Sequence, residues 1–397
     1  MISSSDAVLA GHDQTGVRQW LAVLAVAMGT FLVVTVENLP MGLLTGMASG
    51  LGVAAGSVGL MVTVSGLVAA VAAPVLPVVI RRLDRKTVLL ALVALLVASS
   101  LISALTPNYP VLLAARVLAG ISIGGFWSLA AGLAVRLVRP ANVPRATSLI
   151  FFGAMVGTVL GIPATTLIGG FFGWRVAFLA VAAVSAVLVF ALLALLPPLP
   201  AHEPVRVRTL VQQLRTPAVR TAVIATFLLV SGQYGAFTFV TPILQTIAAV
   251  PAHVVGVLLL VYGLAAILGN FAAAWAAARS VRMTIVVLSA LLATILAIFP
   301  LIGVTPVLGS TLLILWGIAF GALPVTVQTW IIKAAPQATE AATGLNTSVF
   351  NFAIAFGALL GSLVVDSMAL AGVMWITAGL VAMTTLVVWG TREESLT

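Results

Sequence analysis

Runs of apolar residues, each long enough to cross a bilayer, follow one another along almost the whole 397-residue chain. A transmembrane helix needs about 20 predominantly apolar residues. Hydrophobic residues make up 62% of the chain and charged residues only 7%, whereas a soluble domain carries about 25% charged residues. The sequence therefore predicts an all-α membrane protein with twelve transmembrane helices, placed at residues 19–42, 56–80, 87–105, 110–136, 144–171, 175–196, 220–247, 254–278, 283–303, 305–331, 340–366 and 370–390.

The longest polar interruption lies near the middle of the chain and contains five prolines. We interpret it as a linker between two halves of six helices each. The polar N-terminal tail shows no cleavage site of a signal peptide, so the first helix is expected to act as the insertion signal. The predicted organisation is a tail at 1–18, a first half at 19–196, a linker at 197–219, a second half at 220–390 and a tail at 391–397.

The distribution of basic residues predicts the orientation in the membrane. Twelve helices place both termini on one side, and cytoplasmic loops carry the excess of Lys and Arg in membrane proteins. With both termini in the cytoplasm, 16 of the 18 basic residues lie on that side. The exceptions are Arg175 in an outer loop and Arg116 within a helix. The net charge of +9 is thus an orientation signal and does not indicate a nucleic-acid partner.

An internal repeat supports the two halves. At an offset of 200 residues, Thr147, Ser148, Phe152, Gly157, Leu160 and Gly161 match Thr347, Ser348, Phe352, Gly357, Leu360 and Gly361. A second match between the halves pairs Gly120 and Gly124 with Gly317 and Gly321. Glycines at this spacing allow close approach of helices in lipid, so a purely structural seam is the simplest interpretation of any single pair. Together the pairs predict parallel repeats, an arrangement in which two halves rock about a central site.

Several segments resemble motifs of the major facilitator superfamily. The stretch RVLAGISIG at 116–124 resembles its motif B, and GAMVGTVLGIP at 153–163 resembles the antiporter motif C of its drug:proton antiporter branch, with Ile162 interposed before Pro163. The stretch ENLPMGLL at 37–44 is similar to a segment of bacterial sugar, nucleoside and amphenicol exporters. The resemblance covers the whole chain. It implies a monomeric transporter of the bacterial inner membrane that exports a small organic solute in exchange for protons, with Gly157, Gly161 and Pro163 as gating residues.

One motif departs from the family pattern. Between the second and third helices the family has Gly-x-x-x-Asp-Arg-x-Gly-Arg-Arg, and this chain has PVVIRRLDRK at 77–86. Arg81 replaces the aspartate and Asp84 replaces the second glycine. The resemblance assigns a gate latch to this loop, carried by Arg81, Arg82, Asp84 and Arg85. The alternative is a basic cytoplasmic turn that only orients the chain.

Glu37 and Arg116 are the acid and the base that lie well inside predicted helices. An acid in the bilayer is costly and usually marks a path for protons or substrate. Glu37 lies about five residues, and Arg116 about six, from the outer ends of their helices, which places them at similar depth at about 1.5 Å per residue. In the fold that the sequence resembles, both helices face the central cavity. We therefore predict a proton-coupling pair. A static ion pair or a side chain that reaches the interface is the alternative.

Polar and aromatic side chains inside the helices are candidates for binding the substrate, because small-molecule sites are mostly apolar with a few placed polar groups. The candidates are Asn38, Gln233, Tyr234, Phe237, Trp316, Asn346, Phe350 and Asn351. Each amide has an alternative role, which is to bond a neighbouring helix. Gly232, Gly235 and Pro242 predict a bend in the helix at 220–247.

The remaining chemistry is sparse. There is no cysteine, and the three histidines show no metal-ligand spacing, so no metal and no cofactor are predicted. No phosphate-binding loop is present. The expected function is proton-coupled export of a drug, a nucleoside or a sugar-like solute. Proton-coupled uptake by the same fold, a membrane-embedded enzyme acting on lipid, and a non-transporting receptor remain alternatives, although an enzyme would need a cluster of acid, base and nucleophile that the chain does not offer.

Overall fold

The computed structural model describes residues 16–80, 82–200, 215–277, 279–335 and 339–391, and the regular structure of this part is entirely helical. The first half contains α2 (Val17–Leu51), α3 (Ala55–Val79), α4 (Arg85–Leu105), α5 (Tyr109–Leu137), η1 (Pro140–Asn142), α6 (Val143–Val156), η2 (Gly157–Gly161), α7 (Ile162–Phe172) and α8 (Trp174–Leu195). The second half contains α10 (Pro217–Phe237), α11 (Val240–Pro242), η4 (Ile243–Ile247), α12 (Ala252–Ala277), α13 (Val281–Ile302), α14 (Pro306–Ala334) and α15 (Thr339–Trp389).

The described residues contain the twelve predicted spans. Ten helices are long and apolar enough to cross a membrane, and the bent pair of α10 with α11 and η4 makes an eleventh. Ala369, with a φ of 57°, interrupts α15 and divides it into two spans. The first span differs most from its prediction, because α2 continues to Leu51 through Pro40. Glu37 therefore lies 14 residues before the helix end, and the estimate of about five residues was wrong.

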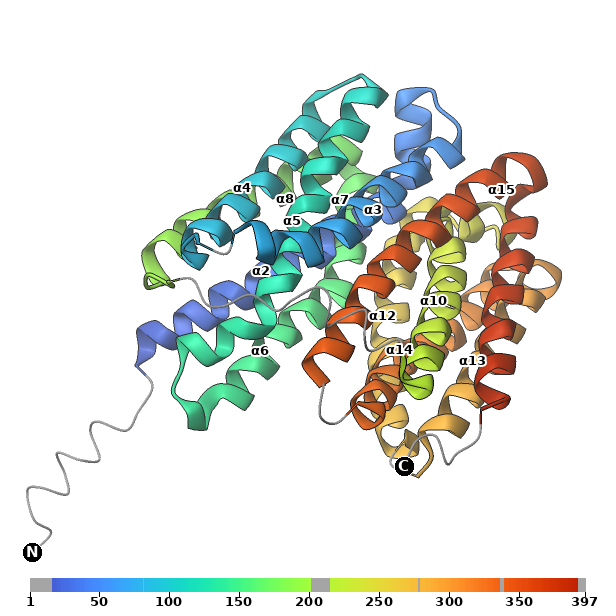
Figure 1. Cartoon of the computed structure of the whole chain (residues 1–397). Coiled ribbons are helices and arrows are strands. Elements are labelled where there is room, and N and C mark those ends of the chain that lie inside the picture. The colour runs from blue at the N-terminus through green and yellow to red at the C-terminus, as the bar shows by residue number, and fades with distance from the viewer. Residues whose placement is uncertain (1–15, 81, 201–214, 278, 336–338, 392–397) are drawn as a thin grey trace, which may run out of the picture.

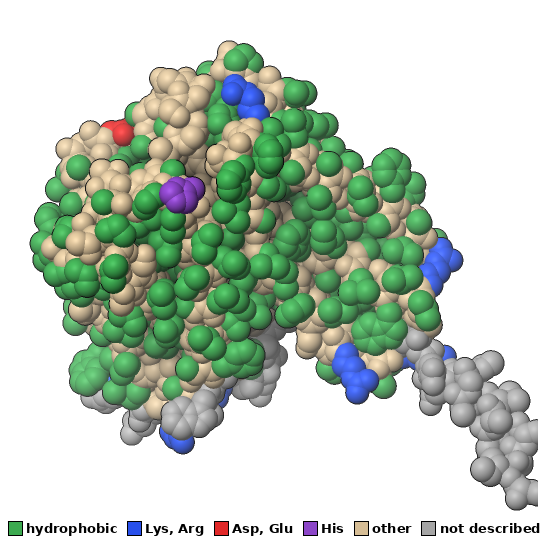
Figure 2. All heavy atoms as spheres, turned by 180° about the vertical axis from the view of Figure 1, so that it is seen from behind, with side chains coloured by type: hydrophobic (Ala, Val, Ile, Leu, Met, Phe, Trp, Pro, Cys, Tyr) green, Lys and Arg blue, Asp and Glu red, His purple; other side chains and the backbone are tan. Residues whose placement is uncertain are grey.

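The two halves lie side by side, and α2 begins and α15 ends toward the same face of the molecule (Figure 1). We call this the terminal face and the other the opposite face. Contacts between the halves join α3 to α15, α7 to α12 and α2 to α11. The flank of the molecule is largely apolar in the space-filling view (Figure 2). Exposed apolar side chains such as Phe190 and Leu386 suit contact with lipid chains.

Glycine seams inside each half confirm the internal repeat in three dimensions. A Cβ on Gly157 would lie 2.7 Å from the carbonyl oxygen of Phe31, and a Cβ on Gly357 would lie 2.2 Å from that of Ser231. Both pairs are 126 residues apart, so the helix pair α2 and η2 and the helix pair α10 and α15 share one register. Only a residue without a side chain permits such backbone contact, which replaces the missing hydrophobic drive between helices in lipid.

A third seam, between the halves, closes the opposite face. Along α3, Gly56, Gly59 and Gly66 contact Asp366, Ser362 and Ala355 of α15 in that order. A Cβ on Gly56 would lie 2.4 Å from Oδ2 of Asp366. The N-terminus of α3 has no side-chain cap and no acid in its first turn. The Asp366 carboxylate thus supplies, from the other half, the negative charge that a helix N-terminus favours.

Candidate functional site

Arg116 lies where α2, α3 and α5 meet, and its side chain is completely buried. Its Nη2 donates to the carbonyl of Val36 and to the hydroxyl of Ser65, both at 3.1 Å. Its Nε donates to the carbonyl of Met61 at 3.3 Å. The buried Nη1 has no partner among the described residues. Since an unsatisfied buried donor on a charged group is costly, this nitrogen is available to an acceptor that enters the site.

Glu37 follows Val36 on α2 and is buried, with 7% of its surface exposed. It interacts electrostatically with Arg116. Within the described residues, however, no hydrogen bond or ion pair joins the two side chains. The structure therefore brings the predicted acid and base to the same level of the membrane without a static ion pair between them.

The predicted bend in the seventh span is present, and the helix contacts different partners before and after it. α10 meets the α11–η4 segment at 54°. Beyond the bend, Thr241 donates to the carbonyls of Met41 at 2.9 Å and Gly42 at 3.4 Å on α2. Before the bend, α10 packs on α14 and α15 instead. The halves therefore touch between α2 and α11 beyond the bend, whereas α10 before the bend packs mainly within its own half.

Gln233 connects three helices of the second half. Its Nε2 donates to the hydroxyl of Tyr262 at 3.0 Å, and its Oε1 accepts from Nε1 of Trp316 at 2.6 Å. The ring of Phe237 stacks on Tyr262 with centroids 4.9 Å apart. The structure thus brings together three predicted residues, Gln233, Phe237 and Trp316, in a buried cluster. Tyr262 was not predicted from the sequence, and the structure adds it to this cluster.

Tyr234 is the partly exposed neighbour of this cluster. The rings of Phe320 and Phe350 meet it edge-on, each with a centroid distance of 6.4 Å. Both phenylalanines are also partly exposed. Phe320 was not predicted, but it lies four residues after Trp316 and therefore on the same side of α14. The three rings form an aromatic wall, a term used below for Tyr234, Phe320 and Phe350.

The predicted amides divide into two kinds. Asn346 accepts from the hydroxyl of Thr226 at 2.7 Å and donates to Gln328 at 3.4 Å, so it joins α10, α14 and α15. Asn38 and Asn351 each donate to a backbone carbonyl four residues earlier in their own helices. Asn346 lines a small crevice with Phe350. The structure therefore places Asn346 beside the aromatic wall, and it leaves Asn38 and Asn351 bonded within their helices.

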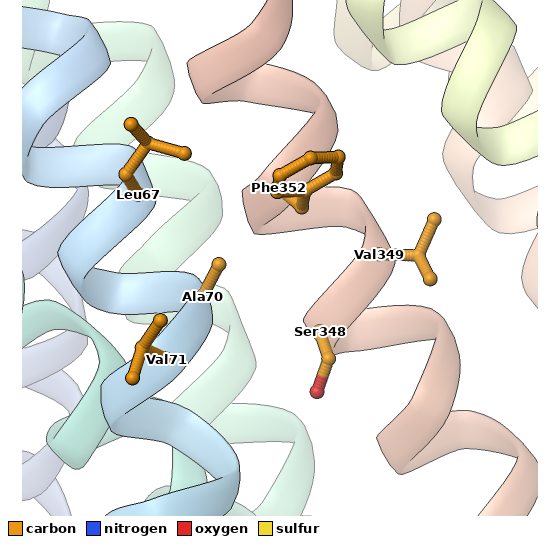
Figure 3. Close-up of a pocket in the computed structure, with 6 residues that line it drawn as sticks. All are labelled: Leu67, Ala70, Val71, Ser348, Val349 and Phe352. Carbon is orange, nitrogen blue, oxygen red and sulfur yellow. The ribbon is translucent and has the colours of Figure 1, made fainter. Parts of the chain in front are cut away.

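A cavity of about 360 Å³ separates α3 from α15 on the side of the terminal face (Figure 3). Leu67, Ala70 and Val71 line it from the first half, and Ser348, Val349 and Phe352 line it from the second. The same two helices are in contact at Gly66 and Ala355, immediately beyond the cavity. Its lining is almost entirely apolar.

The loop between α3 and α4 contacts its own half. The Asp84 carboxylate accepts from the backbone of Lys86 at 2.8 Å and from that of Leu199 at 2.7 Å. The Lys86 ammonium donates to the carbonyls of Leu193 and Leu196 at the end of α8. Arg85 donates to a carbonyl in the same loop, Arg82 is exposed, and Arg81 lies outside the described residues. In this conformation the described residues of the loop fasten α4 to the end of α8 and to Leu199.

The motif on the fifth span has an irregular backbone. Residues 157–161 form a π-helical turn, and Pro163 follows it in α7. Proline lacks the N–H that would continue the helix ladder, which accounts for the wide turn before it. A Cβ on Gly161 would lie 2.2 Å from Oγ1 of Thr35 on α2. Gly157 and Gly161 therefore seat this turn directly against the helix that carries Glu37.

Two six-helix halves that pack against each other around buried polar and aromatic groups are the architecture of a membrane transporter of small molecules. Residues 26–345 match the sequence profile of the Major Facilitator Superfamily. The chain belongs to this superfamily. The comparisons thus confirm the predicted fold and the predicted transporter class, and they favour that class over an enzyme.

Relatives extend this similarity over nearly the whole chain. The purine ribonucleoside efflux pump NepI of Salmonella typhimurium (strain LT2) is 31% identical over 369 residues, which cover 93% of both chains. NepI of Escherichia coli O157:H7 is 31% identical over 378 residues, covering 95% of this chain and 96% of the relative. The fold is similar to that of a mutant form of the nucleoside transporter NupG, with a TM-score of 0.78, 16% identity, and 94% and 99% of the two chains covered.

Proposed function

We propose that this protein exports a purine ribonucleoside, or a solute of similar chemistry, in exchange for protons by alternating access. The observation that carries the proposal is the buried Glu37 beside Arg116, whose Nη1 has no hydrogen-bond partner among the described residues. The aromatic wall lies in the other half near this pair. The two NepI relatives, named as purine ribonucleoside efflux pumps, support the substrate class and the direction. Uptake by proton symport is the second candidate, because the same geometry serves either direction.

Glu37 is proposed to bind the transported proton. A coupling group must hold and release a proton as access alternates, and a buried acid without a fixed partner is free to do both. The neighbouring guanidinium favours the ionised acid, while burial favours the neutral acid. A small rearrangement of Arg116 toward or away from Glu37 would then change which form is preferred. Gly157, Gly161 and Pro163 are proposed to permit that movement, because they seat the fifth span against α2.

The substrate is proposed to bind between Glu37 and the second half. Tyr234 and Phe350 offer ring faces, and Asn346 offers an amide that can exchange its bonds to Thr226 and Gln328 for bonds to a nucleoside. Gln233, Phe237 and Trp316 support this wall from behind. Asn38 and Asn351 are proposed to contribute only if their bonds to their own helices are replaced on binding.

The test is transport of radiolabelled adenosine into inside-out proteoliposomes with an acidic lumen. The wild type is expected to accumulate adenosine against its gradient. Glu37→Gln keeps the shape but cannot titrate, so it should lose accumulation and retain exchange of labelled for unlabelled adenosine. His253→Gln, which removes an exposed titratable group elsewhere, is the control and should transport normally. Uphill accumulation by Glu37→Gln would exclude Glu37 as the coupling site, and accumulation only with the opposite gradient would favour symport.

We also propose that the protein lies as a monomer in the bacterial inner membrane, with the terminal face in the cytoplasm. The positive-inside distribution supports this orientation. On the described terminal face, Arg18 donates to the carbonyl of Ala194 and Arg282 to that of Trp389, so basic residues cap helix ends there. A reporter that is active only in the cytoplasm, fused after residue 397, should be active. An inactive reporter on a correctly inserted chain would reverse the orientation.

A further inference from the structure

Tyr234 faces both halves of the molecule. Its ring is flanked edge-on by Phe320 and Phe350 of the second half. It also lies within electrostatic range of Glu37 of the first half. We propose that Tyr234 is the positioning residue through which the charge of Glu37 controls substrate binding: an ionised Glu37 orients the tyrosine so that the aromatic wall can stack a planar, heteroaromatic ring. This inference rests on the proposed function and adds to it the element that connects proton and substrate.

The register of the two helices places Tyr234 within about one turn of the level of Glu37. α2 and α10 run in the same direction, and the bond from Thr241 to Met41 fixes their relative height. Glu37 lies one turn before Met41, and Tyr234 lies in the last turn of α10, seven residues before Thr241. The 54° bend falls between Tyr234 and Thr241. Tyr234 therefore lies on the α10 side of the bend, before the segment that contacts α2.

The tyrosine hydroxyl is uncommitted. Among the described residues it makes no hydrogen bond, whereas the hydroxyl of Tyr262 accepts from Gln233. Three groups define the electrostatic surroundings of Tyr234. Glu37 of α2 and Tyr262 of α12 act on Tyr234, and Arg116 of α5 acts on Glu37. Among these groups, an ionised Glu37 carboxylate is the strongest hydrogen-bond acceptor for the tyrosine hydroxyl.

The consequence for transport follows from the strength of that contact. Hydrogen bonds to an ionised acceptor are roughly twice as strong as those to a neutral one. When Glu37 is ionised, the hydroxyl is held and the wall is formed. When Glu37 binds a proton, the contact weakens, the ring is released and the substrate loses its stacking surface. Proton and substrate then occupy the carrier alternately, as exchange requires.

A double-mutant cycle tests the inference. Tyr234→Phe, Glu37→Gln and the double variant are purified, and the melting temperature and the affinity for adenosine are measured at neutral and acidic pH. The wild type should lose affinity on acidification, and Tyr234→Phe should lose most of that pH dependence. The melting temperature and the adenosine affinity of the double variant should be no lower than those of the more affected single variant, because both changes remove the same contact between Tyr234 and Glu37. Tyr234→Leu should weaken adenosine binding about tenfold, because it removes stacking.

Tyr262→Phe provides the matched control. It removes the hydroxyl of a neighbouring tyrosine that faces Gln233, so its effects should add to those of Glu37→Gln. Additive effects of Tyr234→Phe and Glu37→Gln, or an unchanged pH dependence in Tyr234→Phe, would overturn the inference. Failure of the wild type itself to bind adenosine would instead overturn the purine assignment and the substrate arm of this inference. The melting-temperature cycle would still decide the contact between Tyr234 and Glu37.

Discussion

The two halves share a backbone plan and differ in the groups that they carry at its centre. The register that places Gly157 over Phe31 also places Gly357 over Ser231, so residues of α2 and α10 correspond at an offset of 200. Glu37 of the first half therefore corresponds to Phe237 of the second. In α5 and α14, Gly120 corresponds to Gly317, and Arg116 corresponds to Leu313.

This difference places charge chemistry in the first half and ring recognition in the second. The first half has the buried acid and base and few aromatic groups around them. The second half has the aromatic wall and the amide cluster, and in its described residues no ionised side chain lies at the equivalent positions. A duplicated scaffold thus allows charge chemistry and ring recognition to be built in separate halves, which meet where Tyr234 faces Glu37.

The largest effect on transport is expected when the buried cation of the first half is removed. Arg116→Ala deletes bonds to two neighbouring helices and leaves Glu37 without its cation. Removing one member of a buried charged group is strongly destabilising. The initial rate of adenosine transport, measured at equal amounts of inserted protein, should fall about a hundredfold.

The equivalent change in the second half is Leu313→Ala, which should cost packing only. Its transport should stay within about threefold of the wild type if the protein remains folded. If both variants lose transport equally, the division of tasks between the halves is wrong.

A smaller and equal effect is expected where the halves are alike. Gly157→Leu and Gly357→Leu each force a side chain into a backbone contact. Each should reduce the transport rate about tenfold through overpacking. Gly379→Leu is the control, because a Cβ there meets open space. Normal transport by both seam variants would show that these contacts are not needed during the cycle.

The smallest effect concerns the seam between the halves. Asp366→Asn removes the charge at the N-terminus of α3 and should weaken closure of the opposite face by about 0.3–1 kcal/mol. In a chain without cysteine, a single Ser362→Cys reports this opening through its reaction with an impermeant maleimide. The labelling rate should rise about two- to fivefold. Asp84→Asn changes a carboxylate of the terminal face and should leave that rate unchanged. An unaltered rate in Asp366→Asn would contradict the seam.

The fold was largely predictable because the bilayer imposes length and polarity on every span. The bend in α10 was also predictable from Gly232, Gly235 and Pro242. The end of α2 was not, because Pro40 and the polar pair at 37–38 imitate a helix end, although packing against the fifth span carries the helix onward to Leu51. The offset of 200 residues could be recognised between the fifth span and α15, where residue types match. It could not be recognised between α2 and α10 at the seam, because Phe31 corresponds to Ser231, a different residue type.

The candidate site was predictable in its membership more than in its contacts. Gln233 and Trp316 were candidates, but their bond depends on a crossing of helices far apart in sequence. Phe320 and Tyr262 were missed because an aromatic residue in an apolar helix gives no local signal. In the altered loop at 77–86, Asp84 caps α4 and accepts from the backbone of Leu199, and the motif did not indicate either contact. These details depend on tertiary packing, and periodicity does not contain them.

The common register of the two glycine seams has an evolutionary consequence. Two helix pairs that keep the same spacing of 126 residues, despite different side chains around them, are the product expected when a gene for six helices is duplicated and fused. Such an ancestor would have paired with a second copy of itself. Its two central sites would have been identical, and Glu37 and Phe237 are one pair of positions at which the two copies now differ.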